Sequence, residues 1–202
     1  MRIPRFLTLL SLATLILSAA SFADTAFTFG PPVGDLGTTV TYTAGAASVT
    51  LWGFSTQISG GPADTHLFLK TGGGDENGMG LVNDPTGDDE ISGTSFIQFK
   101  GTDLTSIAVG SVQDTNGEMY QLWGSSVFGT LGTKIGPAGL NDVTGLALPP
   151  GFAFYSLTAP SGNILLDSVS FAIPTPEPGT TAMILTLGLV GLFEVGRRKL
   201  TA

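Results

Sequence analysis

Glycine, proline, asparagine and aspartate divide residues 24–173 into short runs that are rich in β-branched and aromatic residues. No amphipathic helical stretch of useful length occurs in this region. Short runs separated by turn-forming residues are typical of β-strands joined by tight connections, so the region predicts an all-β fold. The candidate strands are Thr38–Thr43, Ser48–Phe54, Leu67–Lys70, Ser95–Lys100, Ser106–Val112, Met119–Trp123 and Ile164–Ala172.

Two of these runs alternate with the period of two that places neighbouring side chains on opposite faces of a sheet. In the run that begins at Ser95, we expect Ile97 and Phe99 to share one face. In the last run, the residues expected to share a face are Leu165, Asp167, Val169 and Phe171. Seven or more short strands within about 150 residues predict a β-sandwich with a jelly-roll-like arrangement.

Charge is distributed unevenly along the chain. Residues 24–175 contain three lysines and fourteen acidic residues, which gives this part a formal net charge of −11. Such a surface repels phosphate backbones, so we expect no nucleic-acid partner. It is compatible with cations or neutral glycans. The chain has no cysteine, which excludes disulfides, thiolate metal ligands and thiol nucleophiles.

The first 23 residues have the three parts of a secretory signal peptide. Arg2 and Arg5 supply the positive charge, Phe6–Leu17 is an apolar run, and small residues precede a cleavage site after Ala23. The apolar run is too short for a permanent membrane span. The alternative interpretation is a buried N-terminal helix, but the order of the three parts favours a signal that is removed during export.

The C-terminal end also has three parts. Prolines at 174, 176 and 178 interrupt regular structure, and an apolar, helix-competent run of 15 residues follows at 181–195. This run is shorter than the ~20 residues that usually cross a bilayer, and flanking residues can close the gap by snorkelling or local thinning. The basic cluster at 197–199 is expected on the cytoplasmic side. The alternative is a core helix, which would show a polar stripe that this run lacks.

Together these parts resemble the PEP-CTERM sorting signal of Gram-negative bacteria. The resemblance covers residues 174–202 and rests on an apolar run between two short motifs. The motif residues are Pro176, Glu177, Pro178, Arg197, Arg198 and Lys199. The same element is also named an ice-binding protein C-terminal domain, a label that does not itself argue for ice binding. The resemblance implies export, retention in the inner membrane, processing by an exosortase and an association with exopolysaccharide.

The central region resembles ectodomains found in front of such tails, for which no activity is assigned. That resemblance rests on Gly74–Leu81, Asp89–Ile91, Phe96–Gln98 and the stretch from Trp123 to Thr133.

An acidic, glycine-rich segment is the strongest local candidate for a binding site. Six carboxylates lie within sixteen residues, at Asp75, Glu76, Asp84, Asp88, Asp89 and Glu90. Calcium takes six to eight oxygen ligands, so a flexible loop around Asp75 and Glu76 predicts a Ca²⁺ site, with Asp167 as a further candidate ligand. The spacing does not match an EF-hand. A plain solvated turn remains the alternative, because turns also use aspartate, asparagine and glycine.

The sequence gives little support for catalysis. His66 is the only histidine, which excludes a multi-histidine metal centre within one chain, and no G-x-S-x-G motif is present. We expect His66 at a turn or strand edge. Trp52 and Trp123 occur in two copies of Leu-Trp-Gly and fit either a packed sheet face or a sugar platform.

The sequence therefore predicts a signal peptide (1–23), a β-sandwich ectodomain (24–173) and a sorting signal with one hydrophobic helix (174–202). We expect a non-enzymatic surface or matrix protein, first anchored in the inner membrane and then delivered to the cell surface or matrix. Its expected partners are the exosortase, the secretion machinery, the membrane and exopolysaccharide. The alternative is a secreted carbohydrate-active enzyme that uses acids of the 75–90 segment.

Overall fold

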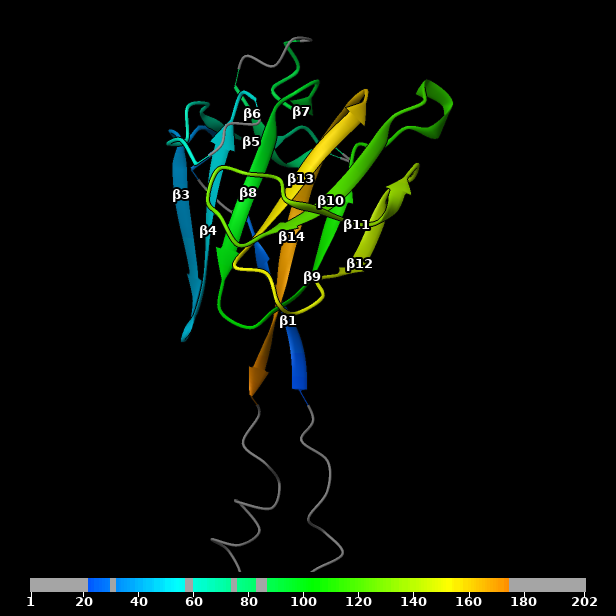
Figure 1. The fold of residues 1–202 in the computed structure, drawn as a ribbon. Coiled ribbons are helices and arrows are strands. Elements are labelled where there is room, and N and C mark those ends of the chain that lie inside the picture. The colour runs from blue at the N-terminus through cyan, green and yellow to red at the C-terminus, as the bar shows by residue number, and fades with distance from the viewer. Residues whose placement is uncertain (1–21, 30–31, 57–59, 74–75, 83–86, 175–202) are drawn as a thin grey trace, which may run out of the picture. The chain divides into compact units, whose positions relative to one another are not determined.

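The computed structural model describes residues 22–29, 32–56, 60–73, 76–82 and 87–174. In these residues the chain is all-β, with one short 3₁₀ turn, η1 (Asp114–Asn116), and no α-helix (Figure 1). The strands are β1 (Phe22–Thr28), β2 (Gly34–Asp35), β3 (Thr39–Ala44), β4 (Ala47–Phe54), β5 (Leu67–Thr71), β6 (Asn77–Leu81), β7 (Ile91–Ser92), β8 (Phe96–Gly101), β9 (Leu104–Gly110), β10 (Met119–Ser125), β11 (Thr133–Gly139), β12 (Val143–Ala147), β13 (Phe154–Ser161) and β14 (Asn163–Pro174).

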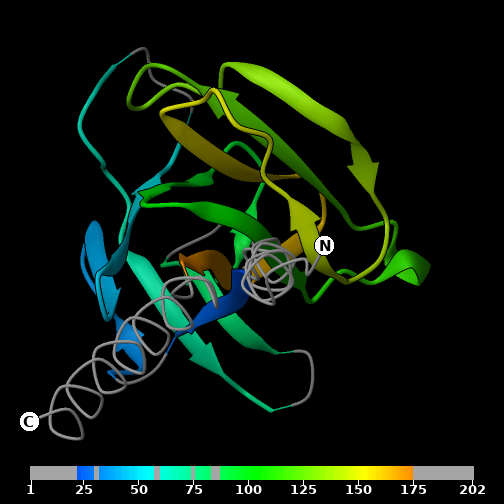
Figure 2. The ribbon, with the colours of Figure 1, turned by 90° about the horizontal axis from the view of Figure 1, so that it is seen from below.

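The strands form two antiparallel sheets, which is the arrangement of a β-sandwich. The six-stranded sheet has the order β11-β10-β13-β8-β4-β3. The eight-stranded sheet has the order β12-β9-β14-β6-β5-β2, and β1 and β7 both pair with β14. Figure 2 shows the two sheets from one end, with the chain crossing repeatedly between them.

One hydrophobic core lies between the sheets. Leu51 and Phe99 reach it from the six-stranded sheet, while Leu67, Val109 and Val169 reach it from the other. These five side chains are at most 1% exposed. Fully burying an aliphatic or aromatic side chain of this size contributes about 1.5–3 kcal/mol, so the alternating pattern holds the two sheets together.

All seven strands expected from the sequence are present, with ends that differ by at most two residues. Period-two alternation predicts the faces of β8 correctly, since Ile97 and Phe99 lie in the core. The β3–β4 hairpin closes through two residues, and Gly45 has the positive φ of 62° that such tight turns require.

The predicted face of β14 is correct for Val169 and Phe171 but wrong for Leu165. Leu166, Val169 and Phe171 lie in the core cluster, and Leu165 does not. The reason is a β-bulge: Leu166 is opposite Val109 and Ser168 is opposite Ala108, so Asp167 is the extra residue of the bulge. A bulge shifts the alternation by one residue, which moves Leu166 to the core face.

The glycine-rich segment around residue 77 is also not the open loop that the sequence suggested. Asn77–Leu81 forms β6, which pairs along its full length with β5 inside the eight-stranded sheet. Its glycines allow close packing rather than flexibility, because a Cβ at Gly80 would lie 2.8 Å from the Cα of Glu90.

Backbone contacts divide the chain into two units, residues 24–172 and a second unit of residues 1–23 and 173–202. The fold above is that of the first unit. Within the described residues no helix is long and apolar enough to cross a membrane. The expected signal peptide, the sorting motif and the expected C-terminal helix lie outside the described residues, apart from the chain at 22–23 and 173–174.

Candidate functional site

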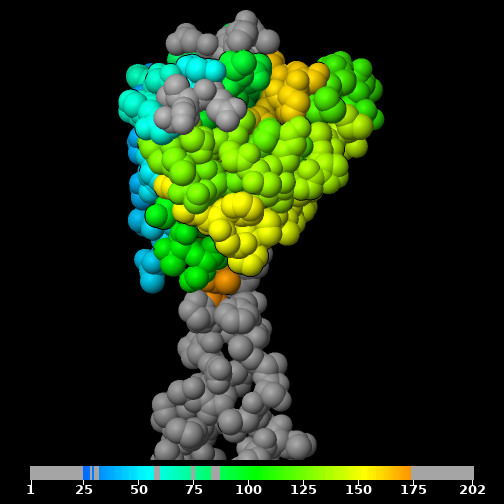
Figure 3. Space-filling view, in the orientation of Figure 1, coloured from blue at the N-terminus to red at the C-terminus, as the bar shows by residue number. Residues whose placement is uncertain are grey.

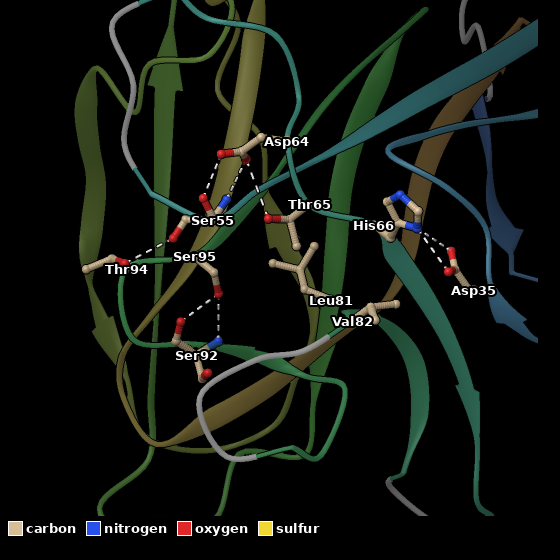
Figure 4. A pocket seen from close by; sticks show the side chains of 10 residues that line it. All are labelled: Asp35, Ser55, Asp64, Thr65, His66, Leu81, Val82, Ser92, Thr94 and Ser95. Carbon is tan, nitrogen blue, oxygen red and sulfur yellow. Dashed lines mark hydrogen bonds and ion pairs between the residues drawn. The ribbon is translucent and has the colours of Figure 1, made fainter.

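A pocket of about 570 Å³ opens where the end of β4, the start of β5 and the end of β6 approach β7 (Figure 4). Its polar lining includes two short networks centred on His66 and Asp64, together with Ser95, whose hydroxyl is hydrogen-bonded to the backbone of Ser92. Leu81 and Val82 supply an apolar side. The pocket is therefore a mixed surface of carboxylate, hydroxyl, imidazole and aliphatic groups.

The first network joins His66 to Asp35. His66 Nδ1 lies 2.9 Å from both carboxylate oxygens of Asp35, and the backbone N–H of Gly37 donates to Asp35 Oδ1 at 2.8 Å. The pairing of β2 with β5 brings these residues together, because Asp35 is opposite Phe68. The hydrogen bond with His66, followed by that from Gly37, lowers the pKa of Asp35. His66 lies just before β5, beside the edge strand β2, as expected from the sequence.

The second network joins Asp64 to Ser55. Ser55 donates to Asp64 through its backbone N–H at 2.8 Å and through Oγ at 2.6 Å. Thr94 Oγ1 in turn donates to the carbonyl of Ser55 at 3.0 Å. Burial acts to raise the pKa of Asp64, but the hydrogen bonds that the carboxylate accepts, first those from Ser55 and then those from the Asp64 N–H and Thr65, together lower that pKa overall.

The two networks remain separate. Among the described residues, no hydrogen bond joins His66 to a serine or threonine hydroxyl, so the pocket does not assemble the nucleophile and base of a serine hydrolase. Figure 4 shows the second ring nitrogen of His66 turned away from Asp35. Asp35 thus orients the ring and leaves one nitrogen to meet a small polar ligand, such as a sugar hydroxyl.

A second polar cluster surrounds Lys70 on β5. Its ammonium forms ion pairs with Glu76 and with Glu90, where Nζ lies 2.5 Å from Oε1. Ser111, directly after β9, donates to Glu90 Oε2 at 3.2 Å. Glu90 is 3% exposed, so the only lysine of the eight-stranded sheet compensates a buried acid.

The three charges shift one another's titration. Hydrogen bonding to Lys70 is the main cause that lowers the pKa of Glu76. Burial is the main cause that raises the pKa of Glu90. Burial acts to lower the pKa of Lys70, but its hydrogen bonds with Glu76 and Glu90 raise it overall. The cluster therefore holds an ionised lysine between two carboxylates of unequal acidity.

The predicted calcium ligands are only partly visible. Asp75 lies outside the described residues, and Glu76 is paired with Lys70. Asp167 occupies the bulge of β14, where a Cβ at Gly110 would lie 2.5 Å from its Oδ2. The described part of the chain contains no group of three or more histidine, aspartate and glutamate side chains that is arranged to hold a metal. Calcium binding remains a prediction.

Sequence reasoning did not find either pocket network. The run Asp64-Thr65-His66 was a visible polar signal. Its partners are distant in sequence, however: Asp35 is 31 residues from His66, and Ser55 is nine from Asp64. Only the pairing of β2 with β5 and the end of β4 bring them together. Comparison with known proteins adds no further constraint, since no family model, curated protein or solved structure matches the chain.

Proposed function

We propose that this chain is an exported, exosortase-sorted surface or matrix protein of a Gram-negative bacterium, and that its β-sandwich is a non-enzymatic binding module linked to exopolysaccharide. The sorting part of this proposal rests on the three-part segment at 174–202 and on the signal peptide expected at 1–23.

The main structural support is the pairing of the first strand with the last. β1 pairs with β14, and Figure 1 shows the two strands side by side at one end of the sandwich. Cleavage after Ala23 would leave residues 24–28 of β1 in place beside β14. The first and last strands of the domain are therefore neighbours. The other strand edges and loops stay available for a partner.

The pocket supports binding rather than turnover. Its carboxylates accept hydrogen bonds from His66, Ser55 and backbone N–H groups, so they are held in fixed positions that can receive sugar hydroxyls. A jelly-roll-like arrangement, in which the last strand β14 lies between β6 and β9, is also part of this proposal.

The competing proposal is a secreted carbohydrate-active enzyme that uses acids of the 75–90 segment. One observation favours it: the pKa of Glu76 is lowered and that of Glu90 is raised, as in acid/base pairs of glycosidases. Against it, Glu90 is buried and bonded to Lys70 and Ser111, which leaves it no open path to a polysaccharide.

Mass spectrometry of both termini tests the sorting proposal. The full chain is expressed in a Gram-negative host with and without an exosortase, and the mature protein is isolated from each. We expect Asp24 as the first residue in both hosts, and a C-terminus near Pro176–Pro178 only where the exosortase is present. Glu177→Gln serves as the matched variant, and we expect its product to keep residues 179–202. A protein that retains residues 1–23 or is processed identically in both hosts would refute the sorting proposal.

A further inference from the structure

The charges of the sandwich are separated between its two sheets. None of the six strands β3, β4, β8, β10, β11 and β13 contains an aspartate or glutamate. These strands carry two of the three lysines of residues 24–173, Lys100 on β8 and Lys134 on β11. The acids of the described residues lie in connections or on the other sheet. The outer face of the six-stranded sheet therefore does not share the negative net charge of the whole domain.

Strand register defines the side chains on that outer face. One row across the sheet consists of Trp52, Gln98, Ser156, Trp123 and Lys134, each directly opposite the next. Directly opposite residues share a face. Their chain neighbours Leu51, Ile97, Leu157 and Leu122 all lie in the core, so this row points away from the core. Gln98 and Ser156, in the middle of the row, are 0% exposed, so the accessible part of the row is formed by Trp52, Trp123 and Lys134. Both copies of the Leu-Trp-Gly tripeptide thus place leucine inward and tryptophan outward.

A second row follows two residues further along the strands. Thr50 is opposite Lys100 and also opposite Thr41, whose Oγ1 lies 2.9 Å from Thr50 Oγ1. Lys100 Nζ lies 5.4 Å from the centroid of the Phe154 ring. The outer face therefore combines hydroxyl groups, half-buried aromatic rings and ammonium groups.

Both ammonium groups are available for a ligand. Lys100 and Lys134 are exposed, and among the described residues neither takes part in an ion pair. Asp103 is the acid nearest to Lys100 in sequence, and no ion pair joins them. Lys134 Nζ instead lies 5.2 Å from the Trp123 ring. Cation–π contacts of this kind hold a lysine over a ring without neutralising its charge.

The aromatic rings are held rigidly. Trp123 Nε1 donates to Thr158 Oγ1 at 2.9 Å, and Trp52 packs edge-on against Phe128 with ring centroids 5.1 Å apart. Phe128 belongs to the loop at 126–132, which crosses in front of β8 in Figure 1 and covers part of the face in Figure 3. Rigid rings lose little conformational entropy when a ligand binds.

We propose that the outer face of the six-stranded sheet binds an acidic polysaccharide, a polymer whose sugar rings carry carboxylate groups. Three strand spacings and two residues separate Lys100 from Lys134, which places their Cα atoms roughly 16 Å apart. Two ammonium groups at this spacing match sparse carboxylates along a sugar chain. The Trp123 and Phe154 rings lie on the strands between the two lysines, and the hydroxyls of Thr50 and Thr41 lie on the strands beyond Lys100. The inference rests on the proposed function and names its ligand class and binding face.

Charge density distinguishes this ligand from a nucleic acid. Two lysines cannot neutralise a closely spaced phosphate backbone, and the fourteen acids elsewhere on the domain repel it. A second copy of this chain is the other acidic partner that the charge separation would suit. Binding and self-association are therefore measured side by side.

Binding to immobilised hyaluronan, which carries a carboxylate on every second sugar, tests the proposal. The full chain is purified in a polyoxyethylene detergent, which contains no sugar, and uncharged dextran serves as the neutral control. We expect saturable binding to hyaluronan that weakens as salt is raised, and little binding to dextran. Replacing both lysines, K100Q/K134Q, should weaken binding about tenfold or more, whereas T115E/N116D, which makes the same change in net charge at the distant turn η1, should weaken it less than threefold.

The outcomes separate this inference from the proposed function. Equal weakening by K100Q/K134Q and T115E/N116D would overturn the inference, because net charge alone would then explain binding. Loss of polysaccharide binding in His66→Gln but not in K100Q/K134Q would place the ligand in the pocket. That result would overturn the proposed binding face and leave the proposed function standing. A lysine-dependent dimer in light scattering without polysaccharide, or equal binding of single-stranded DNA, would also overturn it. Unchanged thermal midpoints show that the variants are folded.

Discussion

Gln98 accepts a hydrogen bond from the backbone N–H of Gly129 at 2.8 Å, which fastens the 126–132 loop to the outer face of the six-stranded sheet. The same side chain donates through Nε2 to the carbonyl of Thr130 at 2.9 Å and to Ser156 Oγ at 3.1 Å. Gln98 is 0% exposed. Both the oxygen and the nitrogen of this buried amide are hydrogen-bonded. The amide therefore links the loop, β8 and β13 through neutral groups alone.

Gln98→Leu should therefore destabilise the domain by about 2–3 kcal/mol, because the N–H of Gly129 and the carbonyl of Thr130 would be left buried without that partner. Urea unfolding followed by tryptophan fluorescence measures the change. Gln113→Leu, at an exposed glutamine next to η1, is the matched control and should cost less than about 0.5 kcal/mol. Equal effects of the two substitutions would show that Gln98 does not fasten the loop.

The Lys70 cluster predicts a stability change that depends on pH. Lys70→Met removes the cation beside buried Glu90, and we expect a loss of about 2–4 kcal/mol at pH 7. The pKa of Glu90 is already raised by burial, and without Lys70 it should rise further. Because protonated Glu90 needs no cation, the variant should regain stability as pH falls from 7 to 5.

A second substitution isolates the cause. Lys70→Met combined with Glu90→Gln should restore most of the loss at pH 7, whereas Lys70→Met combined with Glu76→Gln should restore less, because Glu76 is more exposed. Thermal unfolding at pH 5 and pH 7 measures all three variants. A loss that is the same at both pH values would show that packing of the lysine stem, not charge, is responsible.

The sequence predicts the central strands well because their signal is local. Alternation in 95–100 is a property of six consecutive residues, and it indicates both the strand and its core face. β11 gives a weaker signal, since Gly136 and Pro137 interrupt it, and an edge position lets the sheet accept the proline. β13 was missed although Tyr155, Leu157 and Ala159 alternate toward the core, because serine, alanine and proline lower its apparent strand propensity.

The candidate site is harder to predict because it depends on pairing between distant segments. The acids of the 75–90 segment indicate a loop that attracts cations, but the structure places Lys70 between Glu76 and Glu90. The bulge at Asp167 has no signal in its own strand, since its cause lies in the register with β9. Local pattern thus identifies elements, whereas register and charge pairing appear only in the folded chain.

The pair formed by His66 and Asp35 predicts a shift that NMR titration can measure. Because the hydrogen bond from His66 lowers the pKa of Asp35, its carboxyl should titrate below the ordinary value of 3.8. A lowered pKa contributes stability above pH 3.8 that is lost as pH falls through the folded value. In His66→Gln the carboxyl should titrate closer to 3.8, with Gly37 still donating. An unchanged titration in that variant would show that Gly37 alone causes the shift.

Asp167 and Gly110 predict a steric coupling across the bulge. A Cβ on Gly110 would lie 2.5 Å from Asp167 Oδ2 and 2.6 Å from Oδ1, closer than side chains tolerate. Gly110→Ala should therefore cost about 1–3 kcal/mol, because the carboxylate of Asp167 would be displaced from its place in the sheet. In the background of Asp167→Ser, whose side chain is shorter, the same glycine substitution should cost at least 1 kcal/mol less. Urea unfolding of the four proteins completes the double-mutant cycle, and additive effects would contradict the coupling.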